Sequence, residues 1–227
     1  MSLFKSNFMR QKKWVAVLCY ALGILGSTNL AAQSWPDKPI KMIVPFAAGG
    51  SADILGRILS QELSKNLGQN VIVENRGGAG GNIGAELVAK SPADGYTIFL
   101  HHIGQATAPS LYRKLSYKAY EDFEPIGLVT DVPMTIVARQ DFPAKNINEF
   151  VAYLKANKSK VTLANAGLGS ASHLCGMLLQ QALDADLTTV PYKGTGPAMN
   201  DLLGYLTENC CEGQGCTTTS KPFGEYC

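Results

Sequence analysis

Short apolar runs alternate with apolar positions at helical spacing along most of this 227-residue chain. The first run, residues 40–44, stops at Pro45 and predicts a buried strand. Apolar residues then recur at helical spacing from Ile54 to Leu63, which predicts an amphipathic helix. Further strands are predicted at 71–73, 96–100, 126–129, 135–138, 161–163 and 188–190, and further helices up to Lys90, over 147–157, over 174–183 and up to Leu203. This alternation predicts an α/β fold with a largely parallel sheet.

A glycine-rich turn joins a predicted strand to a predicted helix at four places, near Gly49, Gly78, Gly169 and Gly194. At the first turn, Ser51 is expected to cap the helix, and Asp53 can pair with Arg57 one turn later. Such turns point free backbone N–H groups and the positive end of a helix at one spot, which suits an anion. Ligands bind at strand ends in open α/β sheets, so the four turns could converge on one cleft. The alternative is that they are the ordinary connections of any α/β protein.

Residues 1–32 have the pattern of an export signal. Four basic residues precede an apolar run at 14–25, and small residues lead to an expected cleavage site near Ala32. The run is short for a membrane span, although an uncleaved anchor is the alternative. Without this segment sixteen basic residues face eighteen acidic ones, a net charge of −2. No basic patch with interleaved aromatic residues follows, so nucleic acid is not an expected partner.

The sequence predicts no cofactor, no metal and no catalytic residue. The glycine run at 77–84 misses the dinucleotide-binding spacing and lacks the acidic residue that contacts a ribose. His101 and His102 are adjacent at a strand end, where neighbouring side chains point to opposite faces and do not readily share a metal. His173 is expected to hydrogen-bond within the first turn of a helix, and Cys175 to lie in the core.

The last residues, 205–227, differ from the rest of the chain. They are polar, rich in threonine and cysteine, and without the apolar periodicity that predicts a strand. Four cysteines crowd there: Cys210, Cys211, Cys216 and Cys227. Their spacing fits no zinc site, and in an exported protein they could form disulfides whose pairing stays open.

Several ordered segments between Trp35 and Gly204 match a known pattern. They are 35–40, 44–53, 73–76 with the glycines that follow, 91–96, 122–126, Gly169-Ser170 with His173-Leu174, 190–197 and 201–204. With these segments, the chain resembles the Bug-type extracytoplasmic solute receptors of tripartite tricarboxylate transporters.

This resemblance implies a two-lobed periplasmic binding protein of the Venus-flytrap type (type II), and not an enzyme. It implies lobe 1 at 33–138, part of lobe 2 at 139–204 and a tail outside the family at 205–227. A small carboxylate would bind between the lobes and be delivered to a membrane permease. The residues implied as ligand-binding are Ala48, Gly49, Gly50, Ser51, His102, Gln105, Thr107, Gly169, Ser170, Tyr192, Thr195 and Gly196.

Members of that family continue after the counterpart of Gly204, complete the second lobe and return to the first. The sequence therefore predicts an incomplete second lobe and a missing return. Two alternatives to a working receptor stay open: a remnant that binds nothing, and an exported hydrolase that uses His102 or His173.

Overall fold

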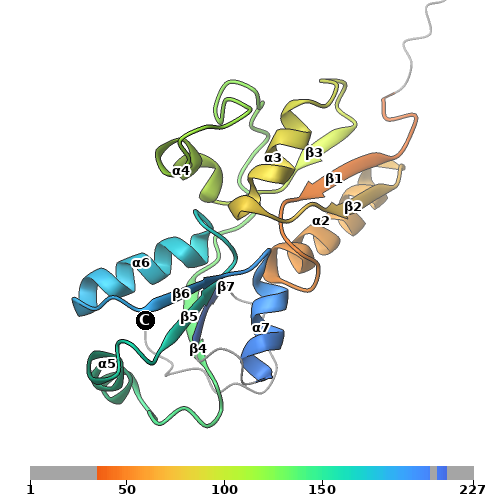
Figure 1. The fold of residues 1–227 in the computed structure, drawn as a ribbon. Coiled ribbons are helices and arrows are strands. Elements are labelled where there is room, and N and C mark those ends of the chain that lie inside the picture. Colours follow the sequence, from red (N-terminus) through yellow and green to blue (C-terminus); the bar gives the residue numbers. More distant parts are fainter. Residues whose placement is uncertain (1–34, 205–208, 214–227) are drawn as a thin grey trace, which may run out of the picture. The chain divides into compact units, whose positions relative to one another are not determined.

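The structure is a computed structural model that describes residues 35–204 and the backbone of 209–213. The chain divides into residues 1–37 and 38–227, and the second unit contains both sheets. The first sheet has three strands, β1 (Ile40–Val44), β2 (Val71–Asn75) and β3 (Thr97–Phe99). They lie in the order β2-β1-β3, and β1 pairs in parallel with both neighbours (Figure 1).

The central strand β1 is buried because both of its faces are covered. Successive side chains of a strand point to opposite faces, so Ile40, Met42 and Val44 share one face. That face packs against α2 (Ser51–Leu67), whose leucines fill the space beneath it. Ile43 points to the other face and is fully buried as well. Each such side chain contributes about 1.5–3 kcal/mol on burial, which explains why this strand anchors the sheet.

Three short helical elements follow β2 and β3. The 3-10 turn η1 (Ala79–Gly81) leads into α3 (Asn82–Ala89), and α4 (Gly104–Leu111) comes after β3. Ala85 of α3 packs in a small cluster with Tyr117 and Ala119 from the loop beyond α4. That loop is irregular, and α4 is not among the helices that the sequence predicts.

The second sheet has four strands, in the order β4-β7-β5-β6. They are β4 (Met134–Ala138), β5 (Thr162–Asn165), β6 (Thr188–Pro191) and β7 (Asn209–Gly213). The β5 strand is parallel to β6 and β7, while β4 is antiparallel to β7. Three helices accompany this sheet: α5 (Ile147–Ala156), α6 (Ala171–Leu183) and α7 (Thr195–Leu203) (Figure 1).

Two separate apolar clusters lie on the two faces of this sheet. Leu163 packs with Phe150 and Leu154 of α5 and with Leu183 of α6. The next residue, Ala164, points to the opposite face and packs with residues of α7. This alternation places α7 across the sheet from α5 and α6, and it positions the starts of α6 and α7 at the strand ends.

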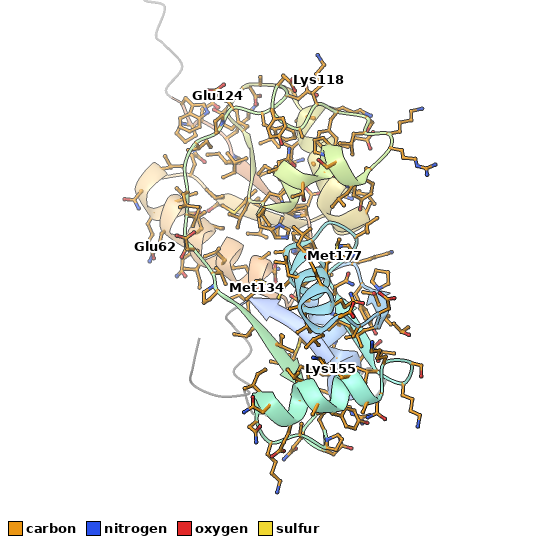
Figure 2. The ribbon with its side chains drawn as sticks, turned by 90° about the vertical axis from the view of Figure 1, so that its left-hand side faces the viewer. Glu62, Lys118, Glu124, Met134, Lys155 and Met177 are labelled. Carbon is orange, nitrogen blue, oxygen red and sulfur yellow. The ribbon has the colours of Figure 1, made fainter. Side chains whose placement is uncertain are left out.

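Two expectations about strands are wrong. Residues 126–129 form no strand, and Figure 2 shows the chain between Glu124 and Met134 as an extended segment without regular structure. Ile126 and Leu128 are 87% and 82% exposed. A strand needs a neighbouring backbone to complete its ladder, and no described strand pairs with this segment.

The second error concerns the tail, where β7 forms although no strand was expected. It inserts between β4 and β5, where both of its edges pair with a neighbour. Ladder hydrogen bonds come from the backbone, so such a central position does not require an alternating apolar sequence. The other tail residues and the proposed signal segment lie outside the described residues. In the part that the structure describes, no helix has the length and apolar character to cross a membrane.

Candidate functional site

The loop between β1 and α2 forms a tight corner. Gly49 has φ of +84°, which favours glycine because a Cβ would be strained there. Gly50 is the N-cap of α2 and offers no side chain to cap it. The first helical hydrogen bonds run from the N–H groups of Asp53 and Ile54 to the Gly50 carbonyl, both at 3.1 Å. Ser51 is therefore the first helical residue and not the N-cap that the sequence predicts.

The N–H groups of Ser51 and Ala52 come before those first helical bonds, so they have no carbonyl partner within α2. Two donors and the positive end of a 17-residue helix thus remain at this corner. Ser51 is half-buried, while Gly50 is buried. This arrangement is suited to an anion.

The helices α3 and α7 also have glycine N-caps, Gly81 and Gly194, and neither helix start has a side-chain cap. Unlike α2, α3 continues directly from η1, and its Asn82 N–H donates to the Ala79 carbonyl. By contrast, Asn146 caps α5 and Ser170 caps α6 through side-chain oxygens that accept N–H bonds. The N-cap residue of α4, Ile103, provides no side-chain cap either. Among the other helices, the uncapped starts are those at the glycine-rich corners after β1, β2 and β6.

The corner before α2 is in direct contact with the corner before α7. A Cβ on Gly50 would collide with the hydroxyl oxygen of Thr195 and would lie 3.2 Å from the Gly196 nitrogen. The Ala47 N–H donates to the Lys193 carbonyl at 2.9 Å. Because these backbones approach so closely, the donors at the two helix starts share one region.

The corner before α3 meets the loop before α6. A Cβ on Gly167 would lie 3.0 Å from the Gly80 nitrogen, and one on Gly80 would collide with the Leu168 carbonyl. The same Leu168 carbonyl accepts a hydrogen bond from the Tyr112 hydroxyl at 2.7 Å. A Cβ on Gly77 would lie 2.9 Å from the Ala47 nitrogen, which links this pair of corners to the first pair. All four glycine turns predicted from the sequence therefore converge.

The two adjacent histidines lie after β3 and not within it. Their rings are 4.8 Å apart and both pack near Phe46, with His102 stacked on it at 4.7 Å. The expectation that they point to opposite faces is thus wrong, because the strand ends at Phe99. The His102 Nδ1 accepts the N–H of Gly104 at 3.0 Å, at the start of α4. Burial lowers the pKa of His102 to about 4 and holds the pKa of His101 well below its ordinary value.

Other predicted site residues have partners within the protein. The Ser170 hydroxyl is fully buried and accepts the His173 N–H at 3.2 Å. The Gly169 N–H donates to His173 Nδ1 at 3.3 Å, which confirms the first-turn role predicted for that histidine. The Tyr192 hydroxyl donates to Asp201 at 2.7 Å.

Two predicted residues lie on α4. The Gln105 side chain donates to the Ala119 carbonyl at 3.0 Å, and its own oxygen is buried without a partner. Thr107 is half-buried one turn into the helix. The residues in contact at the first pair of corners are thus Ala48, Gly49, Gly50, Thr195 and Gly196, with Ser51 at the start of α2.

Sequence reasoning missed several residues that shape these corners. Asn75 ends β2 and donates to both Asp53 (3.0 Å) and the Phe46 carbonyl (3.1 Å). Tyr112, which the sequence did not single out, donates a hydrogen bond to the loop before α6. In the sequence, only the position of Asn75 at the end of a predicted strand indicated that it could shape the site. Among the described residues, no group of three or more metal-ligating side chains is present.

An α/β fold of this kind is that of the periplasmic binding proteins. The solved structure of the periplasmic binding protein BugD aligns with a TM-score of 0.77 and 55% identity over 79% of this chain and 60% of that chain. Residues 55–210 match the family described as the tripartite tricarboxylate transporter family receptor, and the chain belongs to that family. The match runs past Gly204, where the resemblance was expected to stop.

Further relatives agree with this assignment. A UPF0065 protein of Agrobacterium vitis, in the TAR-I ttuE-ttuC' intergenic region, is 49% identical over 94% of this chain and 61% of its own length. MatC from Rhodopseudomonas palustris, solved with bound malate, is 37% identical (TM-score 0.74, 79% of this chain, 61% of that one). An R. palustris protein solved with adipate is 32% identical (TM-score 0.75, 79% and 60%). The chain spans about three fifths of the length of these relatives.

Proposed function

We propose that this chain is a periplasmic solute-binding protein that captures a small dicarboxylate and delivers it to the permease of a tripartite tricarboxylate transporter. The observation that carries this proposal is the convergence of glycine corners at which three helices, α2, α3 and α7, start without a side-chain cap. Uncapped helix starts supply N–H donors and positive dipole ends to one region.

The energetics require several donors to act together. A hydrogen bond to a neutral donor contributes about 1 kcal/mol net, and one to a charged group about 1.5–3 kcal/mol. Micromolar binding corresponds to about 8 kcal/mol. The donors at one helix start therefore contribute too little free energy for micromolar binding. The donors of α2 and α7 together come close to the binding free energy that it requires. The hydroxyls of Ser51 and Thr195 would add to them.

The relatives support a carboxylate as the ligand, since MatC holds malate and another neighbour holds adipate. Both are dicarboxylates that differ in carbon chain. Amide donors recognise the carboxylate ends and tolerate such differences in the skeleton. Closure of the two lobes around the ligand would follow from tighter binding to the closed form.

The geometry does not favour the hydrolase alternative. The Nδ1 atoms of His102 and His173 each accept a backbone N–H at a helix start, so both imidazoles have a structural role. Among the described residues, no hydrogen bond joins the imidazole ring of either histidine to a serine side chain, and the bond between His173 and Ser170 comes from the His173 backbone N–H.

Titration calorimetry and thermal melts of the full chain with malate and adipate test the proposal. Adipamide, which keeps the adipate skeleton without its charges, is the matched control. We expect saturable heat with the acids and a melt that rises with their concentration, since ligand at a hundred times Kd adds about 2.7 kcal/mol of stability. Adipamide should produce neither effect. Equal binding of adipamide, or no binding of any dicarboxylate in a wider panel, would overturn the proposal.

A further inference from the structure

A buried carboxylate lies next to the corner where an anion is proposed to bind. Asp53, in the first turn of α2, is 4% exposed. Its Oδ2 accepts the Gly49 N–H and the Arg57 Nε–H, each at 3.0 Å, and its Oδ1 accepts the Asn75 amide at 3.0 Å. A negative charge so close to a site for carboxylates would repel the ligand unless it is balanced.

The first consequence of this network is mechanical. The bond from Gly49 directs that N–H inward, toward Asp53, and fixes the corner in its positive-φ conformation. Asn75 bonds at once to Asp53 and to the Phe46 carbonyl, so the end of β1, the end of β2 and the start of α2 are tied together. The donors that remain for a ligand are those that follow Gly50.

The second consequence is electrostatic. Arg57 is one turn after Asp53 on the same helix, and its guanidinium forms an ion pair with the buried carboxylate. The arginine side chain is 57% exposed and also reaches the Asn75 oxygen at 3.4 Å. It thereby balances the charge of Asp53 without entering the corner itself.

We propose that Asp53 and Arg57 are positioning residues of the carboxylate site. Asp53 holds the Gly49–Gly50 corner in shape, and Arg57 neutralises the charge that Asp53 would otherwise present to an anionic ligand. This inference rests on the proposed function, and its two halves can be tested separately.

The charged and titratable groups around Asp53 come from several elements. Arg57 is on α2 itself, and on β2 and just after it Glu74 and Arg76 pair with each other. Lys193 belongs to the corner before α7, which bonds to Ala47. His101 and His102 pack on Phe46, and burial holds their pKa values low enough that both stay neutral above pH 6.5. Burial alone would raise the pKa of Asp53, but bonds from Arg57, Gly49 and Asn75 outweigh it and lower that pKa.

The mechanical half is tested by Asp53→Ala against Asp53→Asn. The alanine variant loses the acceptor for the Gly49 N–H, whereas the asparagine variant keeps an oxygen that can accept it. Amide hydrogen exchange at Gly49, measured without ligand, should accelerate at least tenfold in the first and stay within about threefold of wild type in the second. Malate affinity should follow the same order. A Gly49 exchange rate unchanged by Asp53→Ala would overturn this half, whatever happens to binding.

The electrostatic half is tested by Arg57→Gln. It leaves the carboxylate uncompensated, so we expect malate affinity at pH 7.5 to fall about tenfold, equivalent to 1.4 kcal/mol. The double variant Asp53→Asn/Arg57→Gln should bind as Asp53→Asn does, because it has no uncompensated carboxylate. Lys65→Gln, at the exposed Lys65–Glu62 pair of the same helix, is the matched control and should bind as wild type.

The outcomes separate this inference from the function on which it rests. If Arg57→Gln binds normally, or if the double variant binds as weakly as Arg57→Gln, while the wild type binds malate, the charge role is wrong and the proposed function stands. If the wild type binds no dicarboxylate at all, both the charge role of Arg57 and the proposed function are wrong. The hydrogen exchange at Gly49 still decides the mechanical role in that case.

Discussion

The starts of α5 and α6 contrast with those of α2 and α7. At the start of α5, the Asn146 side chain accepts the Glu149 N–H at 3.0 Å, and at α6 Ser170 accepts the His173 N–H at 3.2 Å. Those ends are satisfied by the protein itself. At α2 and α7 a glycine occupies the N-cap position, and the two helix starts are in contact with each other.

The difference suits the anion site proposed above, which would need no fixed positive charge. A serine or asparagine cap contributes about 1 kcal/mol to stability, and a glycine in the same place contributes less. Glycine at the cap leaves first-turn donors free and allows another backbone to approach. The protein therefore has weaker helix starts where a ligand can complete them, and internally capped ones elsewhere.

The largest expected effect is that of Gly50→Val. Its side chain would collide with Thr195 and displace the Gly196 backbone, because a Cβ has no room between the two corners. We expect malate affinity to fall at least a hundredfold, about 2.7 kcal/mol or more. Gly127→Val is the matched control, since nothing lies within 4 Å of a Cβ there and Gly127 has no positive φ. Equal affinities of the two variants, measured by calorimetry, would show that contact between the corners is irrelevant to binding.

A third kind of helix start depends on pH. The His102 Nδ1 accepts the Gly104 N–H at the beginning of α4, and only a neutral imidazole can do so. The pKa of His102 is lowered to about 4 by burial, so the unfolded chain binds more protons between pH 4 and 6.5. Stability should therefore be constant above pH 6.5 and fall progressively below it. Urea unfolding of wild type and of His102→Asn, which keeps an acceptor but does not titrate, measures this. A loss of stability on acidification that is equally steep in both would exclude His102 as its source.

Removing an internal cap should affect stability and leave binding unchanged. Ser170→Ala and Asn146→Ala should each cost about 1 kcal/mol, or roughly 2–4 °C in the melting temperature of a domain of this size. Thermal melts and malate titrations of both variants test this. A variant of Ser170 that melts as wild type but binds malate poorly would place that hydroxyl in the ligand site, as the family resemblance implies, and not only in a cap.

The sequence predicted most elements, because their signals are local. The run at 40–44 and the leucine spacing after Ile54 identify β1 and α2, and the spacing of Asp53 and Arg57 predicted their ion pair. The rule that ligands bind at strand ends predicted that several glycine turns could converge on one cleft. The contacts among those turns bring them together, and the shared cleft stays a prediction.

The failures involve features that local sequence does not determine. Residues 126–129 have strand composition, but no described strand pairs with them, while β7 forms from a polar sequence because two strands flank it. The α4 helix includes Pro109, which disguised its helical pattern. Ser51 is a good cap by residue type, yet the chain turns one residue earlier, at Gly50. In each case the local structure depends on the position of a distant segment or on a single backbone turn, and neither is visible in the local sequence.

The smallest effects should come from the hydroxyls beside the uncapped donors. Ser51→Ala and Thr195→Ala each remove one side-chain donor, while the backbone N–H groups remain, so we expect affinity for malate to fall about threefold to tenfold. Stability should change little, because neither hydroxyl caps its helix. Thr188→Ala, at an exposed position of β6, is the matched control and should bind as wild type. If Ser51→Ala and Thr195→Ala both bind malate as tightly as this control does, the anion contacts only backbone groups at α2 and α7. The two kinds of helix start would then differ in their free backbone N–H groups and not in side chains that bind the ligand.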